Sequence, residues 1–164
     1  MTRDEVLHRL KTARAGFDER VHAIPEAALD RPVPGGTHSP KQIVAHVSAY
    51  ERLIVERLRA ARLGEETVFD RDRVGWEAFN ERVWAESAEK PADAVLAQSA
   101  RDFLALVEEI GMLGNAELAQ LTGIALGIDP AWLQGRSLAE VIGVDGFEHY
   151  PMHYAQLESA AAGD

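Results

Sequence analysis

Two histidines near the C-terminal end of the sequence, His149 and His153, are four residues apart. Side chains at this spacing project from one side of a helix, so their imidazoles can converge on a single ion. A third histidine, His46, lies beside Val47 on what we expect to be the apolar face of an upstream helix. If the two segments pack side by side, the three imidazoles form a metal site. We expect zinc first, because three neutral imidazoles leave a fourth position open, although nickel, copper and iron also accept three histidines.

Four side chains near these histidines are candidates for catalysis. Glu148 precedes the histidine pair but points about 100° away from its neighbour on an ideal helix, and Tyr150 lies between the two histidines. Tyr50 lies one turn after the upstream histidine, with Glu51 beside it. A carboxylate could orient a metal ligand or act as a general base, and a tyrosine could donate to a bound ligand. The simpler alternatives are a solvated carboxylate, a buried tyrosine, and a histidine pair with one ring in the core and one in solvent.

Long amphipathic segments must position these residues. Apolar side chains recur at helical spacing near residues 3–24, 39–63, 91–110 and 137–159, and over a shorter segment at 72–86. No strand-like alternation of useful length is present. The sequence therefore predicts an all-α protein, an antiparallel bundle of four main helices with one extra shorter helix.

Local signals mark several helix boundaries. Glycine and proline interrupt any long element between residues 111 and 136, where we expect one short helix after Asn115. Pro151 lacks a backbone N–H and should bend the last helix between the paired histidines. Three helix starts carry the capping-box pattern, in which a hydroxyl residue is followed three positions later by Glu or Gln: Thr2 with Glu5, Ser39 with Gln42, and Ser137 with Glu140.

Composition limits the classes of partner. The 164 residues suffice for one compact domain over 1–164. A net charge of −10 argues against a nucleic-acid partner and against an anionic membrane surface. Because the chain has no cysteine, thiolate metal sites and cysteine nucleophiles are excluded. No apolar run is long enough for a signal core or a membrane span, so we expect a cytoplasmic protein.

The 72–86 segment carries Trp76, Phe79 and Trp84 on one side. If this aromatic face is exposed, it would form the interface of a homodimer. The alternatives are that the three rings belong to the core or wall an apolar pocket.

Three stretches of the sequence together resemble the DinB-like superfamily and, within it, the four-helix proteins of ClbS/DfsB type. The stretches are Gly35–His46, Trp76–Glu81 and Glu148–His153. The resemblance spans nearly the whole chain. It implies a four-helix bundle, often dimeric, with a three-histidine site for a divalent metal. The family commonly has a tryptophan where this chain has His38, which implies a different pocket entrance.

The resemblance assigns His46, His149 and His153 to the three ligand positions. Some superfamily members are thiol-dependent transferases or isomerases, and a ClbS-like relative hydrolyses a reactive genotoxin. Three hypotheses follow for this chain: a metal-dependent enzyme acting on a small electrophilic compound, a non-catalytic protein that binds or sequesters a small molecule, and a structural dimer with vestigial histidines. Because imidazoles must be neutral to bind metal, we expect affinity to fall as the pH drops through ~6.5.

Overall fold

The computed structural model describes residues 1–72, 74–120 and 135–163, and within these residues the chain is helical with no β-strand. The predicted all-α helix bundle is therefore confirmed. The glycines and proline expected to interrupt the chain between 121 and 134 lie outside the described residues, but the short helix after Asn115 is present. The elements are α1 (Arg3–His22), a 3-10 turn (Glu26–Ala28), α2 (Pro40–Leu63), α3 (Val68–Arg71), α4 (Trp76–Ala88), α5 (Ala92–Gly111), α6 (Asn115–Ala119), α8 (Leu138–Asp145), α9 (His149–Met152) and α10 (Tyr154–Ala162).

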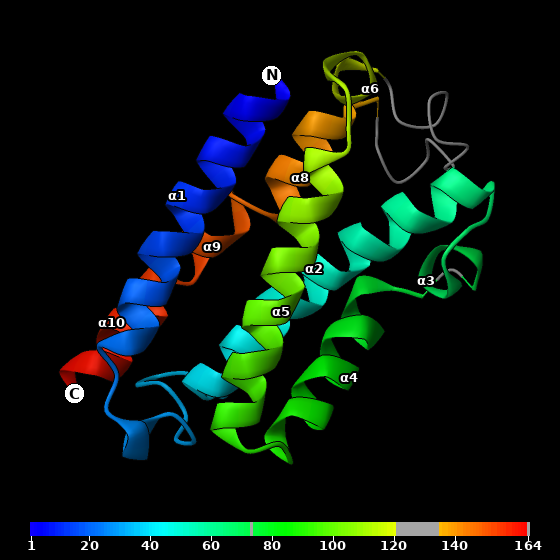
Figure 1. Ribbon diagram of the computed structural model, residues 1–164. Helices are drawn as coiled ribbons and strands as arrows, with labels where there is room; N and C mark the ends of the chain where they lie inside the picture. The colour runs from blue at the N-terminus through cyan, green and yellow to red at the C-terminus, as the bar shows by residue number, and fades with distance from the viewer. Residues whose placement is uncertain (73, 121–134, 164) are drawn as a thin grey trace.

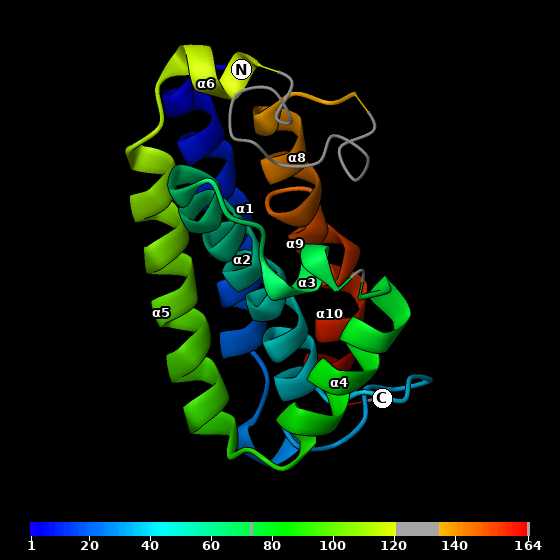
Figure 2. The same cartoon turned by 90° about the vertical axis from the view of Figure 1, so that its right-hand side faces the viewer.

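The helix α2 is central to the arrangement. It contacts α4, α5, α8 and α10, while α1 packs against α5 and against the α8–α10 segment (Figures 1 and 2). Successive long helices alternate in direction: α1 runs down the view of Figure 1, α2 up, α4 down, α5 up and α8–α10 down. This arrangement brings α9 and the start of α10 beside the first half of α2, although about 100 residues separate the contacting side chains in the sequence.

The apolar stripes of the helices meet in one continuous core. Buried members come from α1, α2, α5, α6 and the α8–α10 segment: Leu10, Phe17, Val47, Leu106, Leu118, Ile142 and Leu157. A smaller cluster of Ala49, Leu53, Phe79 and Val83 joins α2 to α4. In the part of the chain that the structure describes, no helix combines the length and apolarity needed to cross a membrane.

The predicted helix starts are confirmed by their caps. The hydroxyl oxygens of Thr2, Ser39 and Ser137 each accept from the backbone N–H three residues later, and the Glu or Gln at that position bonds back. These bonds satisfy two of the N–H groups that a helix start leaves without partners. At its other end α2 stops at Gly64, whose φ of +70° is the left-handed conformation that glycine adopts without strain.

The prediction of one helix over 137–159 is wrong, because the segment divides into α8, α9 and α10. The main break is at Gly146, with φ −117° and ψ −104°. A Cβ atom at this position would lie 2.5 Å from the carbonyl oxygen of Ile142 and 3.0 Å from Leu10 of α1, so only glycine fits. The second break follows Met152, next to Pro151, where a bend was expected; there the backbone N–H of His153 donates to the carbonyl oxygen of Tyr150, three residues earlier.

The extra helix also differs from its prediction. It begins at Trp76 rather than at Asp72, because Asp72 ends the separate short helix α3 and Gly75 becomes the N-cap of α4. Phe79 is buried within the chain, against α2. The aromatic face on which the homodimer was predicted is therefore mostly covered. Of its three rings, Phe79 is buried, Trp84 is half-buried and Trp76 is 41% exposed. The homodimer itself stays a prediction.

Candidate metal centre

The structure brings the three predicted histidines together. His46 lies in the first third of α2, His149 opens α9, and His153 lies between α9 and α10. The Nε2 atoms of His46 and His149 are 3.1 Å apart, and those of His149 and His153 are 3.2 Å apart. Each histidine offers a nitrogen within 4.8 Å of the other two. His46 and His149 are buried and His153 is half-buried, so the cluster lies just below the surface of the bundle.

These separations fit a shared metal ion. Three nitrogens bound at ~2.0–2.1 Å to a tetrahedral zinc ion lie roughly 3.3 Å from one another. The two separations on His149, 3.1 and 3.2 Å, are close to that value. Without an ion, the single Nε2 of His149 would have to serve two other imidazoles at once, which one lone pair or one proton does poorly. Among the described residues, the Nδ1 atom of His46 has no hydrogen-bond partner, whereas a weaker interaction of His149 with the backbone of Asp145 favours its protonated form.

The environment keeps the imidazoles neutral. Burial, followed by repulsion from His149 and His153, lowers the pKa of His46 to about 3. Burial, followed by repulsion from His153, lowers the pKa of His149 to about 4. Burial also lowers the pKa of His153 below its ordinary value. At neutral pH all three rings therefore carry free lone pairs, the form that binds metal.

His153 has an orienting partner that the sequence analysis did not identify. Its Nδ1 lies 2.8 Å from the amide oxygen Oε1 of Gln156, three residues later on α10. An amide oxygen only accepts, so Nδ1 carries the proton and Nε2 presents its lone pair to the cluster. Carboxylates and carbonyl groups that orient metal-ligating histidines act in the same way. The signal available in the sequence was the His–x–x–Gln spacing, which is weak by itself.

Aromatic rings surround the cluster on the α4 side. Trp84 stacks on His46 with centroids 4.4 Å apart and on His38 at 4.0 Å. Tyr50 contacts His46 and His149 edge-on, at 5.0 and 4.7 Å between centroids, and stacks on Trp76 at 5.4 Å. Apart from the two buried histidines, these rings are half-buried or exposed. Rings of α2 and α4 therefore lie directly against the histidines. The alternative that the tryptophans wall an apolar pocket stays a prediction.

Of the four candidate catalytic residues, only Tyr50 touches the histidines. Its hydroxyl donates to Oδ1 of Asn80 at 3.0 Å, and burial raises its pKa. Glu51 and Tyr150 are fully buried and bonded to each other. Glu148 is exposed to solvent. The candidates thus separate into one ring beside the cluster, one buried pair behind it, and one surface carboxylate.

A second group of charged side chains lies near Tyr50. Arg57 of α2 is buried and donates twice to Asp70, at 2.9 and 2.6 Å, and lies 4.0 Å from Asp145. Burial raises the pKa of Asp145 to about 6, against the opposing effect of Arg57. Asp145 ends α8 immediately before the break at Gly146, so this ion cluster joins α2 and α3 to the segment that leads into α9.

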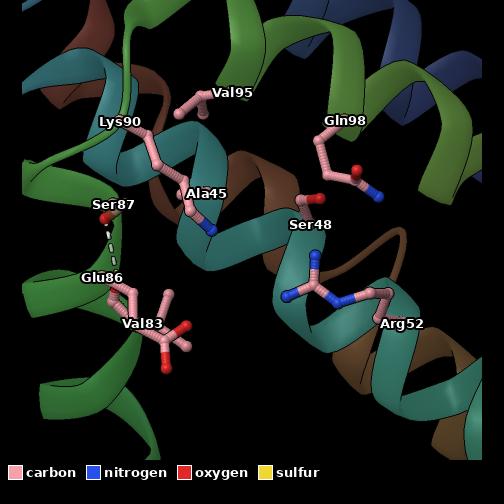
Figure 3. A pocket seen from close by; sticks show the side chains of 9 residues that line it. All are labelled: Ala45, Ser48, Arg52, Val83, Glu86, Ser87, Lys90, Val95 and Gln98. Atoms are coloured by element: carbon pink, nitrogen blue, oxygen red, sulfur yellow. Dashed lines mark hydrogen bonds between the residues drawn. The ribbon is translucent and has the colours of Figure 1, made fainter.

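A cavity lies between α2, α4 and α5 (Figure 3). None of the three histidines lines it. Three of its polar side chains, Ser48, Arg52 and Gln98, hydrogen-bond to the buried carboxylate of Asp102 at 2.5 to 2.8 Å. Because these groups are satisfied within the protein, we do not assign the cavity as a substrate site.

The fold and site define a class: a helical bundle with three histidines converging from its central helix and its C-terminal segment. The chain belongs to the DinB superfamily, whose family model matches residues 9–157. No curated protein sequence matches it significantly.

Several solved structures share the fold. A protein from Streptococcus pneumoniae is 13% identical with a TM-score of 0.80, covering 96% of this chain and 88% of its own. The sibling lethal factor precursor DfsB is 16% identical with a TM-score of 0.79, covering 96% of this chain and 93% of its own. The colibactin self-resistance protein ClbS, solved in complex with a double-stranded DNA, is 14% identical with a TM-score of 0.77, covering 95% of this chain and 93% of its own. The predicted resemblance is confirmed at the level of family and fold.

Proposed function

We propose that His46, His149 and His153 hold a divalent transition-metal ion, zinc before nickel, and that the chain is a metal-dependent enzyme acting on a small electrophilic molecule. The observation that carries the proposal is the convergence of three Nε2 atoms at 3.1 and 3.2 Å. A bound zinc ion with three protein ligands would supply Lewis-acid chemistry at its open position, polarising a substrate oxygen or activating water.

The chain's own residues favour a flat, largely apolar substrate. Tyr50 and Trp84 provide ring edges and faces beside the histidines, and Trp76 extends this surface from Tyr50. Because burial raises the pKa of Tyr50, its phenol stays protonated at neutral pH and serves for hydrogen bonding rather than as a phenolate. Asn80 fixes the direction of this hydroxyl. His153, held by Gln156, is the most exposed of the three ligands and lies nearest to solvent.

The proposed reaction is hydrolysis or thiol-dependent transfer that removes the electrophile, a detoxification or self-protection role. Among the described residues, Glu51 is buried behind the cluster and Glu148 is exposed, so neither of these two carboxyl groups is placed to act as a general base. The alternative function, sequestration of the same class of molecule without turnover, would use the same aromatic surface beside the histidines. A cytoplasmic location remains part of the proposal.

Metal content and turnover test the proposal together. Protein purified without a histidine tag is analysed for metals, and the His46→Ala, His149→Ala and His153→Ala variants are titrated with Zn²⁺ beside His22→Ala, which removes an exposed histidine of α1. We expect stoichiometric binding in wild type and in His22→Ala, and its loss in His153→Ala with helical content retained. Equal zinc affinity in all variants would refute the metal site. Turnover of electrophiles, with and without thiol, then separates an enzyme from a sequestering protein.

A further inference from the structure

The helix that carries His149 is too short to hold itself in place. The helix α9 has four residues and lies between the breaks at Gly146 and after Met152. A single turn of helix is unstable without tertiary contacts. Its anchor is Tyr150, whose side chain has 0% exposure and whose ring packs on Phe17 of α1 with centroids 5.6 Å apart.

The hydroxyl of Tyr150 donates to Oε1 of Glu51, on α2. Glu51 also has 0% exposure, and Arg14 of α1 donates to the same oxygen from Nη1 at 2.9 Å. Arg14 is fixed in turn by Asp18, at 2.8 Å, and by Ser99 of α5, at 2.9 Å. One carboxylate oxygen is therefore the point at which α1, α2 and α9 are joined, with α5 bonded through Arg14.

This bond links the two helices that bear the buried ligands. His46 and Glu51 are both on α2, and His149 and Tyr150 are adjacent on α9. A shift of Tyr150 relative to Glu51 would change the 3.1 Å separation of the two Nε2 atoms. Metal affinity depends on ligands being held close to their bound geometry, and partners beyond the ligands are worth about 10–100-fold.

We propose that Tyr150 and Glu51 are positioning residues of the metal centre: their hydrogen bond sets the separation of His46 and His149 and thereby the affinity for the ion. The inference rests on the proposed metal site and assigns to this pair neither contact with substrate nor a catalytic step. It replaces the role of acid, base or donor that the sequence allowed for either residue.

The chain offers a matched control in Tyr154. It directly follows the ligand His153, and its hydroxyl donates to the carbonyl oxygen of Ala13 on α1 at 2.8 Å. Removal of the Tyr154 hydroxyl, like that of Tyr150, therefore removes one tyrosine hydrogen bond next to a metal ligand. Tyr154 ties its helix to α1, which bears no ligand, whereas Tyr150 ties its helix to α2; Tyr154 is also half-buried where Tyr150 is fully buried.

The experiment titrates metal-free wild type, Tyr150→Phe, Tyr154→Phe and Glu51→Gln with Zn²⁺, and records the visible spectrum of each with Co²⁺. We expect Tyr150→Phe to weaken zinc binding about 10–100-fold and to alter the cobalt spectrum, while Tyr154→Phe stays within about threefold. Glu51→Gln keeps the acceptor oxygen and should stay near wild type. Thermal unfolding of the metal-free proteins measures how much stability each Phe variant loses. If the two losses are comparable, a difference in zinc affinity reports ligand positioning and not general destabilisation.

Equal zinc affinities in Tyr150→Phe and Tyr154→Phe would overturn the proposal. If Tyr150→Phe does not fold, Glu51→Gln is compared with Glu51→Met, which lacks the oxygen that accepts from Tyr150. Equal zinc affinities in these two variants would also overturn the proposal. Failure of wild type to bind Zn²⁺ refutes instead the metal site on which the inference rests.

Discussion

The indole of Trp84 stacks on the imidazole of His46, with ring centroids 4.4 Å apart and planes 21° from parallel. The two residues lie on different helices, α4 and α2, and Gln42 strengthens this contact by donating to the carbonyl oxygen of Trp84 at 3.0 Å. Only the imidazole ring of His46 would therefore separate a bound ion from the fluorescent indole of Trp84.

The stacking predicts an optical signal for metal binding. Paramagnetic Ni²⁺ or Co²⁺ bound by His46 should quench the fluorescence of Trp84, because quenching requires close approach. We expect saturable quenching in wild type and loss of most of it in Trp84→Phe, which keeps a ring against the imidazole. Trp76→Phe is the control, since Trp76 stacks on Tyr50 rather than on a histidine. Equal quenching in wild type and Trp84→Phe would place the ion elsewhere.

The pH dependence of zinc binding should differ from that of free imidazole. The sequence alone predicted a loss of affinity through ~6.5. In the structure the pKa of His46 is lowered to about 3 and that of His149 to about 4, and that of His153 is also lowered. The protonated rings, which cannot bind, are populated only at more acidic pH. Calorimetric titrations should therefore show nearly constant affinity from pH 8 to below about 6, with loss only at more acidic pH. A loss centred near pH ~6.5, as ordinary imidazoles would give, would contradict the neutral, buried cluster.

The positions of the long helices could be predicted because their signals are local. Ser39 and Gln42 lie within one turn, so the start of α2 can be read directly from the sequence. The backbone at Gly146 also packs against Leu10 of α1, more than a hundred residues away, and periodicity does not contain that information. For the same reason the sequence allowed a continuous helix through the histidine pair.

The site could be predicted in part. The spacing of His149 and His153 and the inward face of His46 identified the cluster, since each depends on the geometry of one helix. The role of Glu51 could not be predicted, because Arg14 and Tyr150 reach it from other helices. The contact of Trp84 with His46 likewise depends on the rotation of α4 about its own axis, which the aromatic pattern does not determine.

The break before α9 should be intolerant of a side chain. Gly146→Ala places a Cβ at 2.5 Å from the carbonyl oxygen of Ile142, so we expect it to lower the free energy of unfolding by about 1–3 kcal/mol. Urea denaturation measures the change. Gly111→Ala is the matched control, because its Cβ would meet nothing within 4 Å at the end of α5; it should be neutral or stabilise by up to about 1 kcal/mol. Equal effects of the two substitutions would show that Gly146 is not constrained by its neighbours.

The absence of a nucleic-acid partner is the expectation most in need of a test, since ClbS, which shares the fold, was solved with a double-stranded DNA. This chain carries 27 acidic and 17 basic residues, a net charge of −10. Several of its arginines are already paired: Arg59 and Arg62 with Glu109, and Arg52 with Asp102. Affinity for DNA arises mainly from cations that neutralise phosphates, so few contacts are available here.

We therefore expect no binding of a fluorescently labelled DNA duplex at physiological salt, measured by anisotropy, and at most weak binding at low salt. A basic DNA-binding domain titrated under the same conditions is the control for the assay. The decisive measurement is the slope of log affinity against log salt, which is about −0.9 for each phosphate contact. Binding that persists at physiological salt, with a slope that corresponds to several phosphate contacts, would overturn the charge argument. It would also direct attention to the described surface arginines outside the ion pairs named above, of which Arg101 on α5 is one.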